Sequence, residues 1–217
     1  KIPVTREKPY SIDHNLWGVS IECGELEDPW NAPPKGAYQI TADPMEAPNE
    51  PAEVTIGFEA GVPVSLDGKS CGGVDLIQRL TELGGAHGVG RIDIVENRVV
   101  GIKSREIYEA PAAVLLIAAH RAVEELVFSK NLADLKDSMG RQYANMIYSG
   151  LWFTDLRLAL DAFINETQRY VCGEARLRLF KGAFAVVGRR SPYSLYDKRL
   201  ATYGEGDTFD HKAAAGF

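Results

Sequence analysis

The sequence predicts an α+β fold, in which an antiparallel sheet is built from hairpins, long helices pack on that sheet, and a long irregular arm forms the N-terminus. Three observations support this fold class. Pairs of short strand-like segments are joined by turn residues, and such pairs give antiparallel strands. Helical segments follow whole hairpins instead of alternating with single strands, which argues against parallel β-α-β units. The first 51 residues are dense in Pro, Gly, Asp and Glu and show no sustained period.

The irregular arm is expected to cover residues 1–51 and the α+β body residues 52–217, within one domain of residues 1–217. An irregular segment of this length is uncommon inside a compact domain. It is therefore expected either to carry function or to pack on a neighbouring domain or subunit.

The body is expected to open with a hairpin, a helix and a second hairpin. Residues 53–68 alternate as two short strands joined at Ala60-Gly61. Residues 73–88 place leucines at helical spacing and stop at Gly84-Gly85. The second hairpin is predicted over residues 91–104, with its turn at Glu96-Asn97.

Three long helices and a last hairpin follow. Apolar residues repeat at the helical period over residues 110–128, 131–150 and 153–173. Pro111 is acceptable in a first helical turn, and Thr154 is a candidate N-cap. The final hairpin turns at Lys181-Gly182, and irregular chain follows it.

Composition excludes several classes of function. A net charge of −6 without a basic run argues against nucleic-acid binding. The longest nearly apolar run, "APAAVLLIAA", is too short to span a membrane, and the first residues lack the apolar core of a signal peptide. Cys23, Cys71 and Cys172 are scattered, which argues against a disulfide framework or zinc site and favours a reducing, cytoplasmic compartment. No motif predicts a metal site or a catalytic residue.

Two polar stretches are candidates for ligand binding. In "PYSIDHNLWGVSIE", Ser20 and Glu22 are two residues apart and would point the same way in an extended chain, with Ser11 nearby. The alternative is a capping serine and solvated acids. In the second hairpin, Glu96 at the predicted tip and Tyr108 before the next helix are typical of a binding rim. The alternative is a solvated hairpin. In both cases the remaining charges, Arg98 and Lys103 among them, are expected to face water.

Three segments resemble the C-terminal synthetase domain of the argininosuccinate synthase family. They are "KPYSIDHNLWGVSIECGELEDP", "HGVGRIDIVENRVVGIKSREIYEAPA" and "GRRSPYSLYD", and the resemblance covers essentially the whole chain in order. It implies a homotetrameric ligase that joins citrulline to aspartate with ATP. The expected route passes through a citrullyl-adenylate and releases pyrophosphate and AMP.

The same resemblance implies where the substrates bind. The citrulline-binding residues of the family match Ser11, Ser20, Glu22, Glu96 and Tyr108. ATP, with Mg, and aspartate are expected to be held mainly by an N-terminal domain that this chain lacks, and the C-terminal tail stops short of the family's. The chain alone is therefore expected to be inactive and to bind no cofactor, and its long helices between Ala110 and Val171 are candidates for subunit contacts.

A second hypothesis is a non-catalytic assembly module that retains the fold. The intact set of five polar residues favours the enzyme, because an assembly module has no need to keep them. Sequence upstream of Lys1 would discriminate the two, since a pyrophosphate-binding loop there indicates the ligase.

Overall fold

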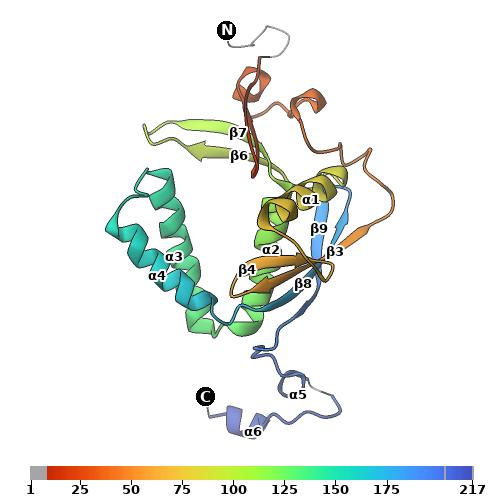
Figure 1. The fold of residues 1–217 in the computed structure, drawn as a ribbon, viewed down its shortest axis with the longest axis vertical. Coiled ribbons are helices and arrows are strands. Elements are labelled where there is room, and N and C mark those ends of the chain that lie inside the picture. The colour runs from red at the N-terminus through yellow and green to blue at the C-terminus, as the bar shows by residue number, and fades with distance from the viewer. Residues whose placement is uncertain (1–8, 203, 217) are drawn as a thin grey trace.

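The computed structural model describes residues 9–202 and 204–216, which form two antiparallel sheets rather than one (Figure 1). The four-stranded sheet has the order β1 (Ser11–Asn15), β2 (Gly18–Glu22), β7 (Lys103–Glu109) and β6 (Arg91–Asn97). The five-stranded sheet has the order β5 (Lys69–Ser70), β4 (Val62–Leu66), β3 (Ala52–Glu59), β8 (Gly173–Phe180) and β9 (Ala183–Arg190). The predicted α+β class is confirmed.

Four long helices occupy the positions that the sequence predicts, with some change at their ends. They are α1 (Gly73–Ala86), α2 (Pro111–Val127), α3 (Lys130–Tyr148) and α4 (Asp155–Gln168). Two short helices, α5 (Lys198–Ala201) and α6 (His211–Ala214), lie in the C-terminal segment. Thr154 occupies the N-cap position of α4, but its hydroxyl donates to the carbonyl of Leu151 at 2.7 Å instead of capping a helical N–H. Helix α4 ends at Gln168, before the predicted stop at Gly173.

The larger hydrophobic core lies between the five-stranded sheet and helices α1 and α2. Ala175, Leu177 and Leu179 of β8 are fully buried, whereas Arg176 and Arg178 between them are exposed. This is the period-two alternation of a strand with one covered face. Each large aliphatic side chain buried in this way stabilises the fold by about 1.5–3 kcal/mol. Helices α3 and α4 form an antiparallel pair that stands to one side of this core (Figure 1).

The N-terminal arm is partly regular over its described residues, 9–51, which corrects the prediction of an irregular arm there; residues 1–8 of the predicted arm lie outside the described part of the chain. Residues 11–22 form the hairpin of β1 and β2, and only short 3-10 turns, Gly24–Glu27 and Lys35–Ala37, interrupt the irregular chain that follows. The turn of the hairpin is set by Asn15, whose side-chain oxygen accepts from the N–H groups of Trp17 and Gly18 at 2.8 and 3.2 Å. A side chain at Gly18 would collide with the carbonyl of Glu109 on β7, 2.5 Å from an added Cβ, so glycine is needed there.

The second hairpin turns later than predicted. Strand β6 continues through Glu96 to Asn97, and residues 98–102 form the turn. Gly101 has φ +88°, a conformation that favours glycine, and its N–H donates to the carbonyl of Arg98 at 2.9 Å. Glu96 is therefore a strand residue opposite Ser104 and does not lie at the tip.

A buried carboxylate fixes the arm to the four-stranded sheet. Glu109 is fully buried, and it accepts hydrogen bonds from the backbone N–H groups of Gln39, Ile40 and Thr41 at 2.7, 3.1 and 2.8 Å. The hydroxyl of Thr41 donates to the same carboxylate at 2.6 Å and accepts from Arg91 at 2.8 Å. These bonds hold the arm over the apolar face of the sheet, where Val19, Ile21, Leu26, Ala37 and Ile107 form a second core.

A polar network joins α2, α3 and α4. The amide nitrogen of Gln168 donates to Glu124 at 2.9 Å, which turns the amide oxygen toward His120, 2.7 Å from Nε2. Nε2 of His120 therefore carries a proton and donates it. Lys136 on α3 pairs with Glu124 at 2.8 Å. Burial lowers the pKa of His120, and the opposing effect of Glu124, 3.6 Å from Nδ1, does not cancel it.

We expect Glu109→Gln to lower the free energy of unfolding of the chain by about 2–4 kcal/mol, because an amide NH₂ would face backbone N–H groups and leave buried donors unsatisfied. Urea denaturation measures this loss. Glu27→Gln, at an exposed position of the same arm, is the matched control and should change stability by less than about 0.5 kcal/mol. Equal stability of the two variants would contradict the role of Glu109.

We expect His120 to make folding sensitive to acid. Its pKa is lower in the folded than in the unfolded chain, so the unfolded chain binds more protons once the pH falls below about 6.5, and stability decreases there. Denaturation midpoints measured from neutral pH downward should fall less steeply for His120→Gln than for the wild type. Parallel pH profiles would show that His120 does not contribute.

Candidate functional site

The four-stranded sheet brings the predicted binding residues onto one face. They are Ser11, Ser20, Glu22, Glu96 and Tyr108. Ser11 lies opposite Glu22, and Ser20 lies opposite Tyr108, in the antiparallel registers of β1 with β2 and of β2 with β7. Opposed residues of neighbouring strands share a face, as do residues two apart on one strand. Glu96 joins them through its carboxylate, which accepts from the Tyr108 hydroxyl at 2.9 Å.

Further residues share this surface, which we call the polar face. It consists of Ser11, Asp13, Ser20, Glu22, Glu96, Ser104, Glu106 and Tyr108. The sequence produces it by alternation, because Val19, Ile21 and Ile107 turn to the opposite face and are buried under the arm. The residues between them must then point away from that core.

Tyr108 acts as a hydrogen-bond donor on the polar face. Burial raises the pKa of its hydroxyl, and the hydrogen bond to Glu96 raises that pKa further. The hydroxyl therefore keeps its proton at neutral pH. A carboxylate has two acceptor oxygens, so Glu96 can accept from Tyr108 and still accept from a ligand.

Sequence reasoning missed a charged cluster in the middle of the polar face. The Nη2 atom of Arg98 donates to Glu22 at 2.8 Å, to Ser104 at 3.0 Å and to Glu106. The Ser104 hydroxyl donates to Glu106 at 2.8 Å. The expectation that Arg98 merely faces water is thus wrong, whereas Lys103 is exposed as expected. The alternation of Ser104, Glu106 and Tyr108 along β7 was the available signal.

The electrostatics of the polar face favour a cationic group. Four carboxyl groups, those of Asp13, Glu22, Glu96 and Glu106, lie on this face, and the guanidinium of Arg98 interacts with the last three. Burial raises the pKa of Glu106, and the neighbouring Glu22 adds to that rise. An acidic surface with phenol and serine hydroxyls can bind a ligand that carries an ammonium group together with neutral hydrogen-bonding groups.

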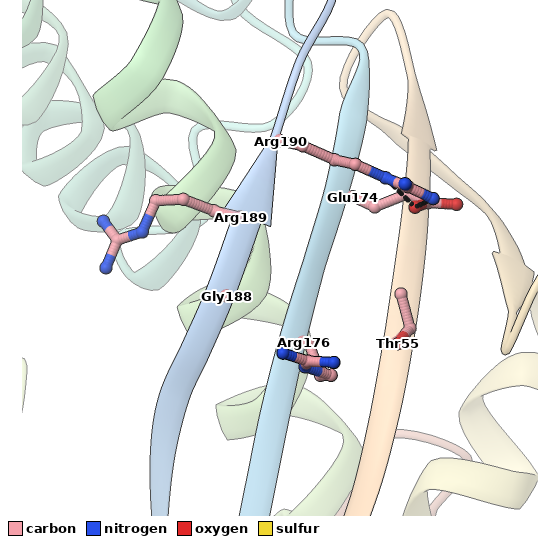
Figure 2. Close-up of a pocket in the computed structure, with 6 residues that line it drawn as sticks. All are labelled: Thr55, Glu174, Arg176, Gly188, Arg189 and Arg190. Carbon is pink, nitrogen blue, oxygen red and sulfur yellow. Dashed lines mark hydrogen bonds and ion pairs between the residues drawn. The ribbon is translucent and has the colours of Figure 1, made fainter. Parts of the chain in front are cut away.

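Two depressions elsewhere do not include residues of the polar face. One, of about 340 Å³, lies on the outer face of the five-stranded sheet (Figure 2). There Arg190 reaches across to Glu174 and pairs with it, while Arg189 points to the other side and pairs with Glu125 of α2. The other, of about 370 Å³, is largely apolar; Phe58, Leu116, Ile117, His120 and Trp17 are among its lining residues.

Two kinds of site or segment are absent from the part of the chain that the structure describes. Across residues 9–202 and 204–216, no three His, Cys, Asp or Glu side chains gather in a way that would hold a metal ion. In the same residues, no helix has both the length and the apolar character needed to cross a membrane. Cys23, Cys71 and Cys172 are all free thiols.

Comparison with known proteins points to one family. Residues 10–217 match the family model described as the arginosuccinate synthase C-terminal domain. Curated relatives named argininosuccinate synthase are 61% identical over 217 residues in Pelodictyon phaeoclathratiforme, 60% over 218 residues in Chlorobium luteolum and 59% over 218 residues in Chlorobaculum tepidum. Each alignment covers 100% of this chain and 54% of the relative. The chain therefore spans about half the length of the curated relatives it matches.

Proposed function

The chain belongs to the arginosuccinate synthase C-terminal domain family, and we propose that its polar face binds citrulline within a complete argininosuccinate synthase. One observation carries the proposal. The resemblance of short motifs assigns Ser11, Ser20, Glu22, Glu96 and Tyr108 to citrulline. Residues from segments far apart in the sequence nevertheless lie on one face of one sheet.

The chemistry of citrulline suits this surface. Its α-ammonium group complements the excess of carboxylates, and its ureido N–H groups can donate to them. Serine and tyrosine hydroxyls can donate to the ureido oxygen or to the α-carboxylate. Ile92 and Ile94, which lie opposite Tyr108 and Glu106 on β6, are partly exposed and offer contact to the methylene chain. A ligand lacking the ureido or ammonium group would leave these partners unpaired and would bind poorly.

The proposed reaction uses the polar face for positioning. The ureido oxygen of citrulline attacks the α-phosphorus of ATP, and pyrophosphate leaves with the electrons of the broken P–O bond. The aspartate amine then attacks the ureido carbon of the citrullyl-adenylate, and AMP leaves. No residue of the polar face need transfer a proton, because holding the ureido oxygen in line with the phosphorus can supply a large part of the rate. ATP, Mg and aspartate are proposed to bind mainly to residues outside this chain.

Assembly and location complete the proposal. We place subunit contacts of a homotetramer on α3, α4 and the segment that joins them, where large apolar side chains are exposed. They include Ile147, Leu151, Phe153, Leu156 and Leu158. Three free thiols are compatible with the reducing cytoplasm.

In the complete protein, we expect Glu96→Ala and Ser20→Ala each to raise the KM for citrulline by roughly 5- to 150-fold, which corresponds to about 1–3 kcal/mol of lost polar pairing. Steady-state kinetics with citrulline as the varied substrate measures the effect. Glu82→Ala, at an exposed position of α1, is the control and should keep the wild-type KM. Wild-type citrulline kinetics in both site variants would remove these residues from the site.

The 217-residue chain alone should release no AMP above background from citrulline, aspartate and ATP, because most contacts to ATP and aspartate are proposed to lie outside it. An assay of AMP formation, with the complete protein as the positive control, tests this. AMP formation by the chain alone would contradict the proposal that ATP and aspartate bind mainly to residues outside it. A complete protein that never acts on citrulline would instead support the assembly module.

A further inference from the structure

We propose that Arg98 is a positioning residue of the polar face, which holds Glu22 beside Glu106 and so keeps Glu22 oriented toward citrulline. The inference rests on the citrulline-binding function proposed above. From the sequence alone, Arg98 is expected only to face water.

The strand register places two carboxylates, Glu22 and Glu106, opposite each other next to Arg98. Strand β2 pairs with β7 so that Ser20 opposes Tyr108 and Ile21 opposes Ile107. Continuing this register by one residue places Glu22 opposite Glu106. Like charges directly opposite each other on a sheet are destabilising. The two carboxylates therefore repel each other, and without a counter-charge the more accessible Glu22 side chain would turn away from Glu106.

The guanidinium of Arg98 lies between the two carboxylates and pairs with both. Arg98 is the first residue after β6, and its Nη2 atom contacts Glu22 on β2 as well as Glu106 and Ser104 on β7. The Glu106 side chain is only 5% exposed, whereas those of Glu22 and Arg98 are 33% and 38% exposed. Glu106 is thus the buried anchor, and Glu22 is the carboxylate that remains accessible to a ligand. An arginine cannot lose its proton under these conditions, so the counter-charge is permanent.

A purely structural tie makes a different prediction from a positioning role. If Arg98 only fastened the hairpin turn, its loss would reduce stability and would affect all substrates alike. If it sets the direction of Glu22, its loss changes the binding of citrulline selectively. The effect should then depend on pH, because a proton on Glu106 would relieve the repulsion of Glu22.

The test is Arg98→Met in the complete protein. We expect the KM for citrulline to rise about tenfold or more, with the KM values for aspartate and ATP changed less than about twofold. The defect should be larger near about pH 8.5 than near about pH 6, since one proton taken up by the pair at lower pH relieves the repulsion and settles on the more buried Glu106. Arg98→Lys keeps the charge and should recover part of the loss.

Two further variants separate the role of Arg98 from the general effect of losing an arginine between strands. Arg178→Met removes another arginine that bridges strands, since Arg178 on β8 pairs with Glu53 on β3 at 2.7 Å, and it should leave citrulline kinetics unchanged. Adding Glu106→Gln to Arg98→Met removes the opposing charge. This double variant should bring the KM for citrulline back to within about threefold of the wild type, a coupling that a double-mutant cycle measures.

A titration without citrulline separates this inference from the function on which it rests. Carbon-13 NMR of labelled glutamate should show the carboxyl of Glu106 titrating at higher pH in Arg98→Met than in the wild type, because the guanidinium that lowers its pKa is gone. An unchanged titration, or a changed titration with wild-type citrulline kinetics, would overturn the positioning role. Wild-type protein that shows no dependence on citrulline would overturn the proposed function, and the titration would still decide whether Arg98 sets the ionisation of the pair.

Discussion

The buried carboxylate of Glu109 is the constraint on which the arrangement of the polar face depends. It accepts hydrogen bonds from three backbone N–H groups and from the hydroxyl of Thr41, all in the N-terminal arm. Moving a charge out of water costs several kcal/mol, and these four donors offset the cost. Because Glu109 ends β7 and lies just before Pro111 at the start of α2, the same bonds fix the arm, the four-stranded sheet and the first long helix together.

This fixation decides which face of the four-stranded sheet remains available to a ligand. The arm covers the side that carries Val19, Ile21 and Ile107, so the alternating side chains of β2 and β7 are left on the other side. Tyr108 is next to Glu109 in sequence, so the hydrogen bonds of Glu109 fix its position most directly. An irregular segment thus has a definite role: it supplies the apolar cover that a four-stranded sheet needs, without a helix of its own.

The polar face combines residues that differ in how firmly they are held. Glu106 is nearly inaccessible and is fixed by Arg98 and Ser104, while Tyr108 is fixed by Glu96. Asp13 is exposed, and Ser11 and Ser20 are partly so. Such a surface suits positioning of a neutral ureido group more than proton transfer, since its tyrosine remains protonated and its arginine permanently charged. Helices α3 and α4, which carry exposed apolar side chains, stand to one side of the five-stranded sheet (Figure 1).

The sequence by itself determined the α+β class, the four long helices and the hairpins of the five-stranded sheet, because each depends on local period and turn residues such as Ala60-Gly61 and Lys181-Gly182. Its motifs also selected the five candidate binding residues. Only the tertiary structure decided that the hairpin of β1 and β2 joins β7 through β2, that Glu96 lies within a strand, and that Arg98 and Glu109 are bound rather than solvated. Those features depend on pairing between segments far apart in the chain, and the charge of a residue does not reveal whether its partner is water or a distant backbone N–H group.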